Sequence, residues 1–208
     1  MEGQAGSSNP VQEAKASPAK HLDLSINNAV TEGTGDIKKI YTLLSPPIGR
    51  GAFGEERKAI HNATKIERAV KIYRKEEFQD EELKRFINEV EILKQLDHPN
   101  IIRVFEYFQD KDNFYIVTEL CTGGELFDRI ISAQHFTEET AKATMSQILS
   151  AVAYFHEKGI VHRDLKPESI LCETKDPKSN LKVVDFSSAV LYDKKNSLTS
   201  RIGTVNFS

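Results

Sequence analysis

The residues best suited to chemistry lie in one short polar run, V-H-R-D-L-K-P-E-S-I-L, from Val161 to Leu171. Apolar residues stand at both ends of the run, so a buried frame can hold the polar side chains between them. Asp164 can accept or orient the proton of a hydroxyl nucleophile, and Lys166 can stabilise charge on a transferring phosphoryl group. The spacing therefore indicates a loop that places an acid–base group and a cation beside a hydroxyl substrate.

A second run, G-R-G-A-F-G, begins at residue 49 and contains three glycines. Glycine lets backbone N–H groups approach phosphate oxygens closely, because no Cβ stands in the way. In dinucleotide-binding folds such a run opens into a helix. Here it leads to E-E-R-K-A-I-H and then to A-V-K-I-Y, which are typical of strands. We therefore expect a phosphate-binding hairpin that uses Gly49, Gly51 and Gly54.

Lys71 and Glu89 are candidates for holding phosphate charge. Strand alternation in A-V-K-I-Y separates Lys71 from Val70 and Ile72, so the lysine should face a cleft. Glu89 stands between apolar positions of a helical pattern, in N-E-V-E-I-L-K, where it could position the lysine. Either residue alone would more often face water.

A further carboxylate stands at Asp185, where the apolar run V-V meets D-F-S-S. A strand that ends there would place the carboxylate at the mouth of a cleft. Mg²⁺ prefers hard oxygen ligands of this kind. Phe186 should pack into the core beside it.

The elements that must position these groups follow from apolar periodicity. Residues 1–37 lack periodic apolar positions and predict a disordered N-terminal extension. Five antiparallel strands are expected after it, at Ile40–Ile48, Glu56–His61, Arg68–Tyr73, Ile102–Phe108 and Asn113–Leu120. Apolar residues at three- and four-residue steps predict a helix from about Leu83 to Leu93, which ends before Pro99.

The second half of the chain is expected to be mainly helical. The C-T-G-G run from Cys121 to Gly124 indicates a hinge. Thr137 should cap a helix that Gly159 ends, and a short strand should follow at Leu181–Val184. The fold class is therefore α+β, with a five-stranded antiparallel lobe plus one helix and a mainly helical second lobe.

Composition excludes several other classes. Lys and Arg total 28 against 31 Asp and Glu, a net charge of −3, so neither a nucleic-acid surface nor a membrane surface is expected. The two cysteines, Cys121 and Cys172, lack metal-binding spacing and suit a reducing compartment. The sequence has neither a signal peptide nor an apolar run of about 18 residues, so a cytoplasmic protein is expected.

Together these motifs resemble those of eukaryotic-type serine/threonine protein kinases from about Tyr41 to Phe207. The runs G-A-F-G-E, L-D-H-P-N-I-I and L-C-T-G-G-E-L-F-D-R-I are similar to the calcium-dependent and calmodulin-dependent group. The resemblance implies a bilobal domain over 38–208, with an N-lobe at 40–118, a hinge at 119–124 and a partial C-lobe at 125–208. It also implies transfer of the γ-phosphoryl group of ATP, with Mg²⁺, to Ser or Thr hydroxyls of proteins.

By the same resemblance, each candidate residue takes a role. Asp164 and Lys166 are catalytic, whereas Asp185 and Ser169 hold the metal. Contacts to ATP come from Ile48, Gly49, Gly51, Gly54, Ala69, Lys71, Glu89, Glu119, Cys121, Glu125 and Leu171. Thr118 is the gatekeeper, and a hydrophobic spine joins Leu93, Phe105, His162 and Phe186.

Three residues depart from the family pattern. Glu56 replaces a valine above the adenine ring, Ser169 replaces the metal-binding asparagine, and Ser187 replaces the glycine of D-F-G. These departures leave a second function open, that of a catalytically impaired nucleotide- or protein-binding module. The sequence also stops before the family's A-P-E motif, so helices within 125–158 are expected to expose apolar surface. It contains no EF-hand calcium loop pattern.

Overall fold

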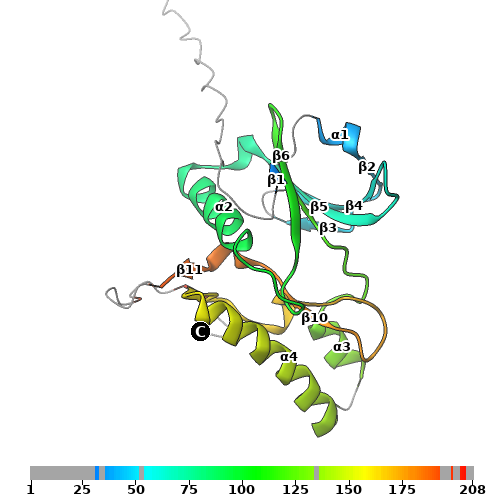
Figure 1. Ribbon diagram of the computed structural model, residues 1–208, viewed down its shortest axis with the longest axis vertical. Helices are drawn as coiled ribbons and strands as arrows, with labels where there is room; N and C mark the ends of the chain where they lie inside the picture. Colours follow the sequence, from blue (N-terminus) through cyan, green and yellow to red (C-terminus); the bar gives the residue numbers. More distant parts are fainter. Residues whose placement is uncertain are drawn as a thin grey trace, which may run out of the picture.

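The computed structural model describes residues 31–32, 36–51, 54–133, 136–192, 198 and 202–204. Figure 1 shows two parts, a sheet with helix α2 (Asp80–Leu93) beside it and a lower part dominated by α3 (Leu126–Ser132) and α4 (Glu138–Glu157). The predicted α+β class is confirmed. None of the described helices is long and apolar enough to cross a membrane.

One large sheet forms the upper part. Its strands pair in the order β1-β6-β7-β5-β4-β2, and β3 pairs with the first residues of β4. All pairings are antiparallel except the parallel pairing of β1 with β6. The strands are β1 (Thr31–Glu32), β2 (Tyr41–Leu43), β3 (Gly49–Gly51), β4 (Gly54–His61), β5 (Glu67–Arg74), β6 (Val104–Gln109) and β7 (Asn113–Thr118).

The N-terminal side of this sheet corrects the prediction. Of the strand expected at Ile40–Ile48, only β2 at Tyr41–Leu43 forms, and Pro46 and Pro47 have no N–H to donate to a ladder. A separate short strand, β3, lies in the glycine run that was expected to be a turn. Ordered structure also begins inside the predicted extension, where Thr31–Glu32 forms β1 and the short helix α1 (Ile37–Ile40) buries its first residue. The described sheet therefore has seven strands instead of five. The remainder of the predicted extension lies outside the described residues.

Helix α2 covers one face of the sheet and begins and ends near the predicted positions. Its buried residues Phe86, Val90 and Leu93 share a core with Phe114 and Ile116 of β7. Three acidic residues in its first turn, at 80–82, suit the positive end of the helix dipole. The apolar period therefore identified the face that packs on the sheet.

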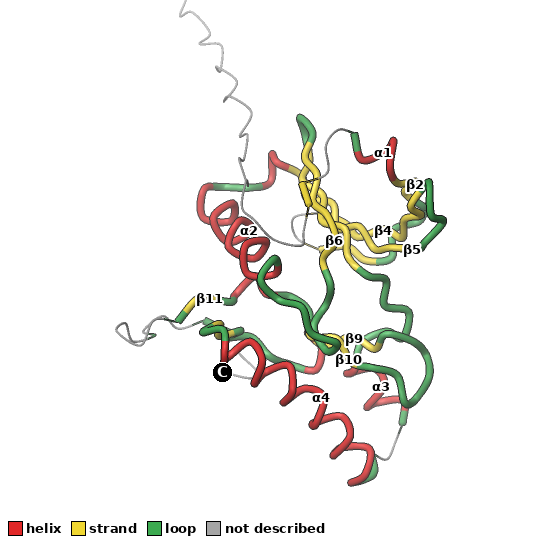
Figure 2. The backbone as a smooth tube through the Cα atoms, in the orientation of Figure 1, coloured by secondary structure: helices red, strands yellow, loops and turns green. Residues whose placement is uncertain are grey.

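The lower part is joined to the sheet by residues 119–124, which form neither helix nor strand. Besides α3 and α4, two small two-stranded antiparallel sheets are present. Strand β9 (Ile170–Cys172) pairs with β10 (Leu181–Val183), and β8 (Ile160–Val161) pairs with β11 (Val190–Leu191). Figure 2 shows β9 and β10 between the large sheet and α3. Three short 3₁₀ turns complete the described elements, at Lys75–Glu77, Pro167–Ser169 and Phe186–Ser188.

Helix α4 begins and ends as the sequence predicts. The hydroxyl of Thr137 accepts a hydrogen bond from the N–H of Thr140 at 3.2 Å, which caps the first turn. Gly159 follows the last turn with a φ of +69°, a left-handed conformation that favours glycine.

Apolar side chains on the outer faces of α3 and α4 are exposed. Ile131 of α3 is 61% exposed, and Met145 and Leu149 of α4 are 48% and 57% exposed. Ala151 and Phe155, on the inner face of α4, are fully buried. The predicted exposure of apolar surface on these helices is confirmed.

The glycines of the G-R-G-A-F-G run differ in the space around them. A Cβ at Gly54 would stand 1.8 Å from the carbonyl oxygen of Ile72 on the neighbouring strand β5. A Cβ at Gly49 would meet only the side chain of Glu56, at an ordinary 3.7 Å. Strand packing therefore requires a glycine at position 54 and tolerates a methyl group at position 49.

Gly54→Ala should lower the free energy of unfolding by about 1–3 kcal/mol, because the methyl group must push β4 away from β5. Gly49→Ala is the matched control, and it should leave stability unchanged or slightly raised, since alanine restricts the unfolded chain. Urea denaturation of the two variants measures the difference. Equal stability of the two variants would contradict the assigned packing.

Candidate active site

Two adjoining cavities lie between the upper and lower parts. The smaller has a volume of about 440 Å³ and the larger about 840 Å³, both in the range of small-molecule sites. Six residues line both cavities: Gly49, Glu56, Lys71, Glu89, Glu125 and Asp185. The charged residues among them come from the sheet, from α2, from the end of the hinge and from the segment after β10.

Most residues predicted to contact a nucleotide line the smaller cavity. They are Ile48, Gly49, Ala69, Lys71, Glu89, Glu119, Cys121, Glu125 and Leu171, together with the predicted gatekeeper Thr118. Gly54 lines the larger cavity, and Gly51 pairs with Gly54 at the tip of the hairpin. Asp185 lines both cavities, whereas Asp164, Lys166 and Ser169 line neither of them.

Lys71 projects from β5 into both cavities, and Glu56 is its direct cross-strand neighbour on β4. Directly paired residues share a face of the sheet, so Glu56 enters the cleft beside the lysine. Tyr73 contributes most to raising the pKa of Lys71, and burial opposes the rise, while Glu89, Glu56 and Asp185 add to it. Because tyrosine is uncharged at neutral pH, the three carboxylates are the groups that act on the ammonium there.

Glu89 is a buried carboxylate, 5% exposed, on the inner face of α2. Burial raises its pKa, whereas Lys71 lowers it and Asp185 raises it further. Lys71 and Glu89 do not form a direct ion pair in the described part of the chain, so the predicted pair is present only as an attraction over a longer separation.

Asn88, the residue before Glu89 on helix α2, connects this helix to the lower part. The amide of Asn88 donates a hydrogen bond to the backbone carbonyl of Ala189 at 2.7 Å. This bond links α2 to the residues that directly follow the Phe186–Ser188 turn. The position of Glu89 in the cleft therefore depends on the segment after Asp185.

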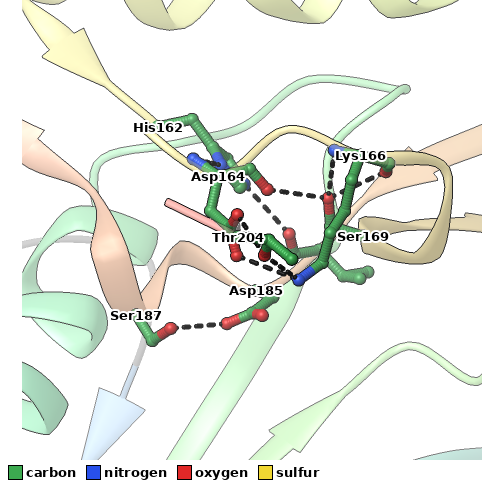
Figure 3. Close-up of polar contacts among 8 residues, drawn as sticks. His162, Asp164, Lys166, Ser169, Asp185, Ser187 and Thr204 are labelled. Atoms are coloured by element: carbon green, nitrogen blue, oxygen red, sulfur yellow. Dashed lines mark hydrogen bonds and ion pairs between the residues drawn. The ribbon is translucent and has the colours of Figure 1, made fainter. Parts of the chain in front are cut away.

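The predicted catalytic pair is held together by a third residue, as Figure 3 shows. Lys166 Nζ donates to Asp164 Oδ2 at 3.1 Å and to the hydroxyl oxygen of Thr204 at 2.6 Å. The Thr204 hydroxyl donates to Asp164 Oδ1 at 2.7 Å. Burial tends to raise the pKa of Asp164, but these hydrogen bonds outweigh it, and the pKa lies below its usual value. Asp164 is therefore an ionised carboxylate with both oxygens oriented.

His162 fixes the start of the catalytic loop. Its ring packs against Phe186, with centroids 4.7 Å apart, and lies near Phe155. Nε2 contacts the carbonyl oxygen of Val184 at 3.1 Å, and Nδ1 accepts the N–H of Asp164 at 3.3 Å. These contacts assign the proton to Nε2. Burial lowers the pKa of His162, so the ring is neutral and places the backbone of Asp164.

Asp185 adopts a left-handed conformation, with φ 62° and ψ 68°, at the turn after β10. The Ser187 hydroxyl donates to Asp185 Oδ1 at 2.7 Å. Ser187 itself lies in a 3₁₀ turn, and the positive φ falls on Asp185. The serine therefore meets no conformational need for glycine at this position and instead orients the carboxylate.

The predicted hydrophobic spine is wrong at one position. A β-bulge at 104–106 leaves Phe105 without a partner on β7, which reverses the expected alternation. The Phe105 ring lies against two guanidinium groups, 3.9 Å from Arg68 and 5.3 Å from Arg103. Val104 is buried instead, in the same core as Leu93 and Phe186.

Sequence reasoning did not assign Thr204 to the site. The threonine is 40 residues from Asp164, and no local pattern marks it. Asn88 and Glu168 were also missed; Glu168 lines the smaller cavity. Only their positions beside the predicted Glu89 and Lys166 could have indicated them.

Fold and site together define the class of protein. The chain belongs to the protein kinase domain family, which it matches over residues 43–208. The matched range contains the glycine hairpin, Lys71, the loop at 161–171 and the turn after Asp185.

Among curated proteins, the chain is similar to several calcium-related kinases. It is 38% identical to calcium-dependent protein kinase 3 of Plasmodium yoelii yoelii over 179 residues, which are 86% of this chain and 33% of that protein. It is 42% identical to a calcium/calmodulin-dependent protein kinase of Metarhizium anisopliae over 161 residues, 77% of this chain and 41% of that protein. A probable myosin light chain kinase of Dictyostelium discoideum is 40% identical over 163 residues, 78% and 42% of the two chains. The chain thus spans between a third and two fifths of the length of these relatives.

The neutral state of His162 predicts a pH dependence of stability. Its pKa in the folded chain lies below the unfolded value of about 6.5. The stabilisation is therefore present above about pH 6.5 and is lost as the pH falls through the folded pKa. His162→Phe keeps a ring against Phe186 and removes the titrating group, so its free energy of unfolding should fall less between pH 7 and pH 5.

Denaturant titrations at several pH values would measure this slope. The same substitution at exposed His156 is the matched control for loss of a histidine. Parallel pH profiles for the parent and His162→Phe would contradict the assignment.

Proposed function

We propose that this chain binds Mg–ATP in the two cavities and transfers the γ-phosphoryl group to Ser or Thr hydroxyls of proteins. The observation that carries this proposal is the joint contact of Asp164, Lys166 and Thr204. It supplies an ionised acceptor and a cation at one point, next to a cleft that contains Lys71 and Asp185. The alternative of an impaired binding module gains no support from the family match or from the relatives' names.

In this proposal, the adenine lies in the smaller cavity between Ala69 and Leu171, below Ile48. The backbone of Glu119 and Cys121 offers the hydrogen-bonding edge, and the phosphates extend past Gly49 toward Lys71. Burial raises the pKa of the Cys121 thiol to about 12, so this residue stays an uncharged wall of the cavity. The lining residues therefore suit a flat, neutral base at one end and a charged group at the other.

The phosphate end fits a divalent cation at Asp185, whose carboxylate lines both cavities. Bound there, Mg²⁺ would neutralise charge on the phosphate oxygens. Asp164 would orient the substrate hydroxyl and receive its proton, since its carboxylate is ionised. Lys166 would then stabilise charge on the transferring group. The Thr204 hydroxyl would keep the side chains of Asp164 and Lys166 in their positions next to each other.

Asp164→Asn should lower the transfer rate by about a hundredfold or more, because the amide cannot accept the proton. ATP affinity should change little, since Asp164 lines neither cavity. Incorporation of γ-labelled phosphate into mixed Ser/Thr peptides measures the rate, and a fluorescent nucleotide measures affinity. Asp176→Asn, in the exposed turn between β9 and β10, is the isosteric control. If the parent chain binds ATP but transfers no labelled phosphate to the peptides, the result contradicts the proposal.

Glu56 should weaken nucleotide binding, because its carboxylate faces the same space as the phosphates. Two unit charges about 10 Å apart interact by about 1.7 kcal/mol at an effective dielectric constant of 20. Glu56→Gln should therefore tighten ATP binding by about tenfold. Glu67→Gln, which removes an exposed charge on β5, is the control for net charge. Equal ATP dissociation constants for the two variants would sink this role for Glu56.

A further inference from the structure

The Ser169 hydroxyl makes all of its hydrogen bonds to the backbone of its own loop. Its hydroxyl oxygen accepts the N–H of Lys166 at 3.0 Å. Its proton can reach the carbonyl oxygen of Asp164 at 3.1 Å or that of Lys166 at 3.0 Å. Ser169 is 2% exposed, and it lines neither of the two cavities. The hydroxyl therefore faces the loop backbone and not the space where phosphates would lie.

A serine cannot divide these tasks as an amide side chain can. An asparagine has an NH₂ group for donating to loop carbonyls and a separate oxygen that remains available to a cation. Serine has a single oxygen, which here takes part in every contact that the side chain makes. The loop thus keeps its internal hydrogen bonds, and the side chain has no second polar atom to offer a cation.

The other carboxylates near the cleft differ in what remains available. Both oxygens of Asp164 are occupied, one by Lys166 and the other by Thr204. Asp185 has one oxygen bonded to Ser187, and within the described residues its second oxygen accepts no hydrogen bond. The described chain holds no group of three or more His, Cys, Asp or Glu side chains that could bind a metal ion. Any cation must therefore take most of its ligands from the nucleotide and water.

We propose that this chain binds nucleotide together with one divalent cation, held by Asp185, and that Ser169 positions the loop without binding metal. The proposal rests on the nucleotide binding proposed above. It differs from the metal-binding role that family resemblance implied for Ser169. Mg²⁺ commonly keeps several waters and needs only one or two carboxylates beside phosphate oxygens, so one protein ligand suffices.

Counting bound Mn²⁺ tests this proposal without measuring activity. Electron paramagnetic resonance of free Mn²⁺, titrated against the chain saturated with a non-hydrolysable ATP analogue, should give one bound ion per nucleotide. Ser169→Asn supplies the missing amide oxygen and should raise the count to two. Ser169→Ala should leave the count at one, whereas Asp185→Asn should remove the bound ion.

The outcomes separate the two proposals. Two bound ions in the parent chain, or loss of an ion in Ser169→Ala, would overturn the single-cation site while nucleotide binding stands. Binding of the ATP analogue is measured separately with a fluorescent nucleotide. If the analogue does not bind at any Mn²⁺ concentration, the proposed function is overturned as well. If Ser169→Asn fails to fold, the number of Mn²⁺ ions that the parent chain binds per nucleotide still decides between one cation and two.

Discussion

A single ammonium group inside the cleft constrains the arrangement of the whole molecule. A partly buried charge is costly without opposite charges nearby, and Lys71 meets this requirement with three carboxylates. Each comes from a different element: Glu56 from β4, Glu89 from α2 and Asp185 from the segment after β10. Attraction to Lys71 therefore adds to packing in holding the sheet, helix α2 and the lower part together. An added polyanion would compete with these carboxylates for the same cation.

The loop that contains Asp164 and Lys166 is organised mainly by hydrogen bonds to its backbone and to the Asp164 carboxylate. His162 accepts the backbone N–H of Asp164, and Ser169 bonds to the backbone on both sides of Leu165. Thr204 donates a hydrogen bond to one carboxylate oxygen of Asp164, and Lys166 donates one to the other. These hydrogen bonds orient Asp164, Lys166 and Ser169, and the atoms that make them are already engaged. The same hydrogen bonds are the basis for proposing that Ser169 positions the loop without binding a cation.

Local patterns in the sequence were sufficient for much of the fold. The apolar period of α2, the cap at Thr137 and the glycine at 159 each fixed an element, because these signals act within a few residues. The side-chain period of two placed Lys71 in the cleft. The role that family resemblance implied for Phe105 was wrong, since one extra residue in β6 changes the face of that side chain and no local signal marks the bulge. Contacts between distant segments, such as Thr204 with Asp164 or β1 with β6, depend on tertiary packing and could not be predicted.

The short first strand has a further consequence for solubility. Strand β6 would otherwise be the outer strand of the sheet, with six residues of backbone open to another chain. Pairing of Thr31–Glu32 with Glu106 and Tyr107 covers part of that backbone, and the opposite border consists of β2 and β3, each only three residues long. Open strand borders are templates for intermolecular sheet growth, and short ones are poor templates. The sheet is thus protected against edge-to-edge association at both borders.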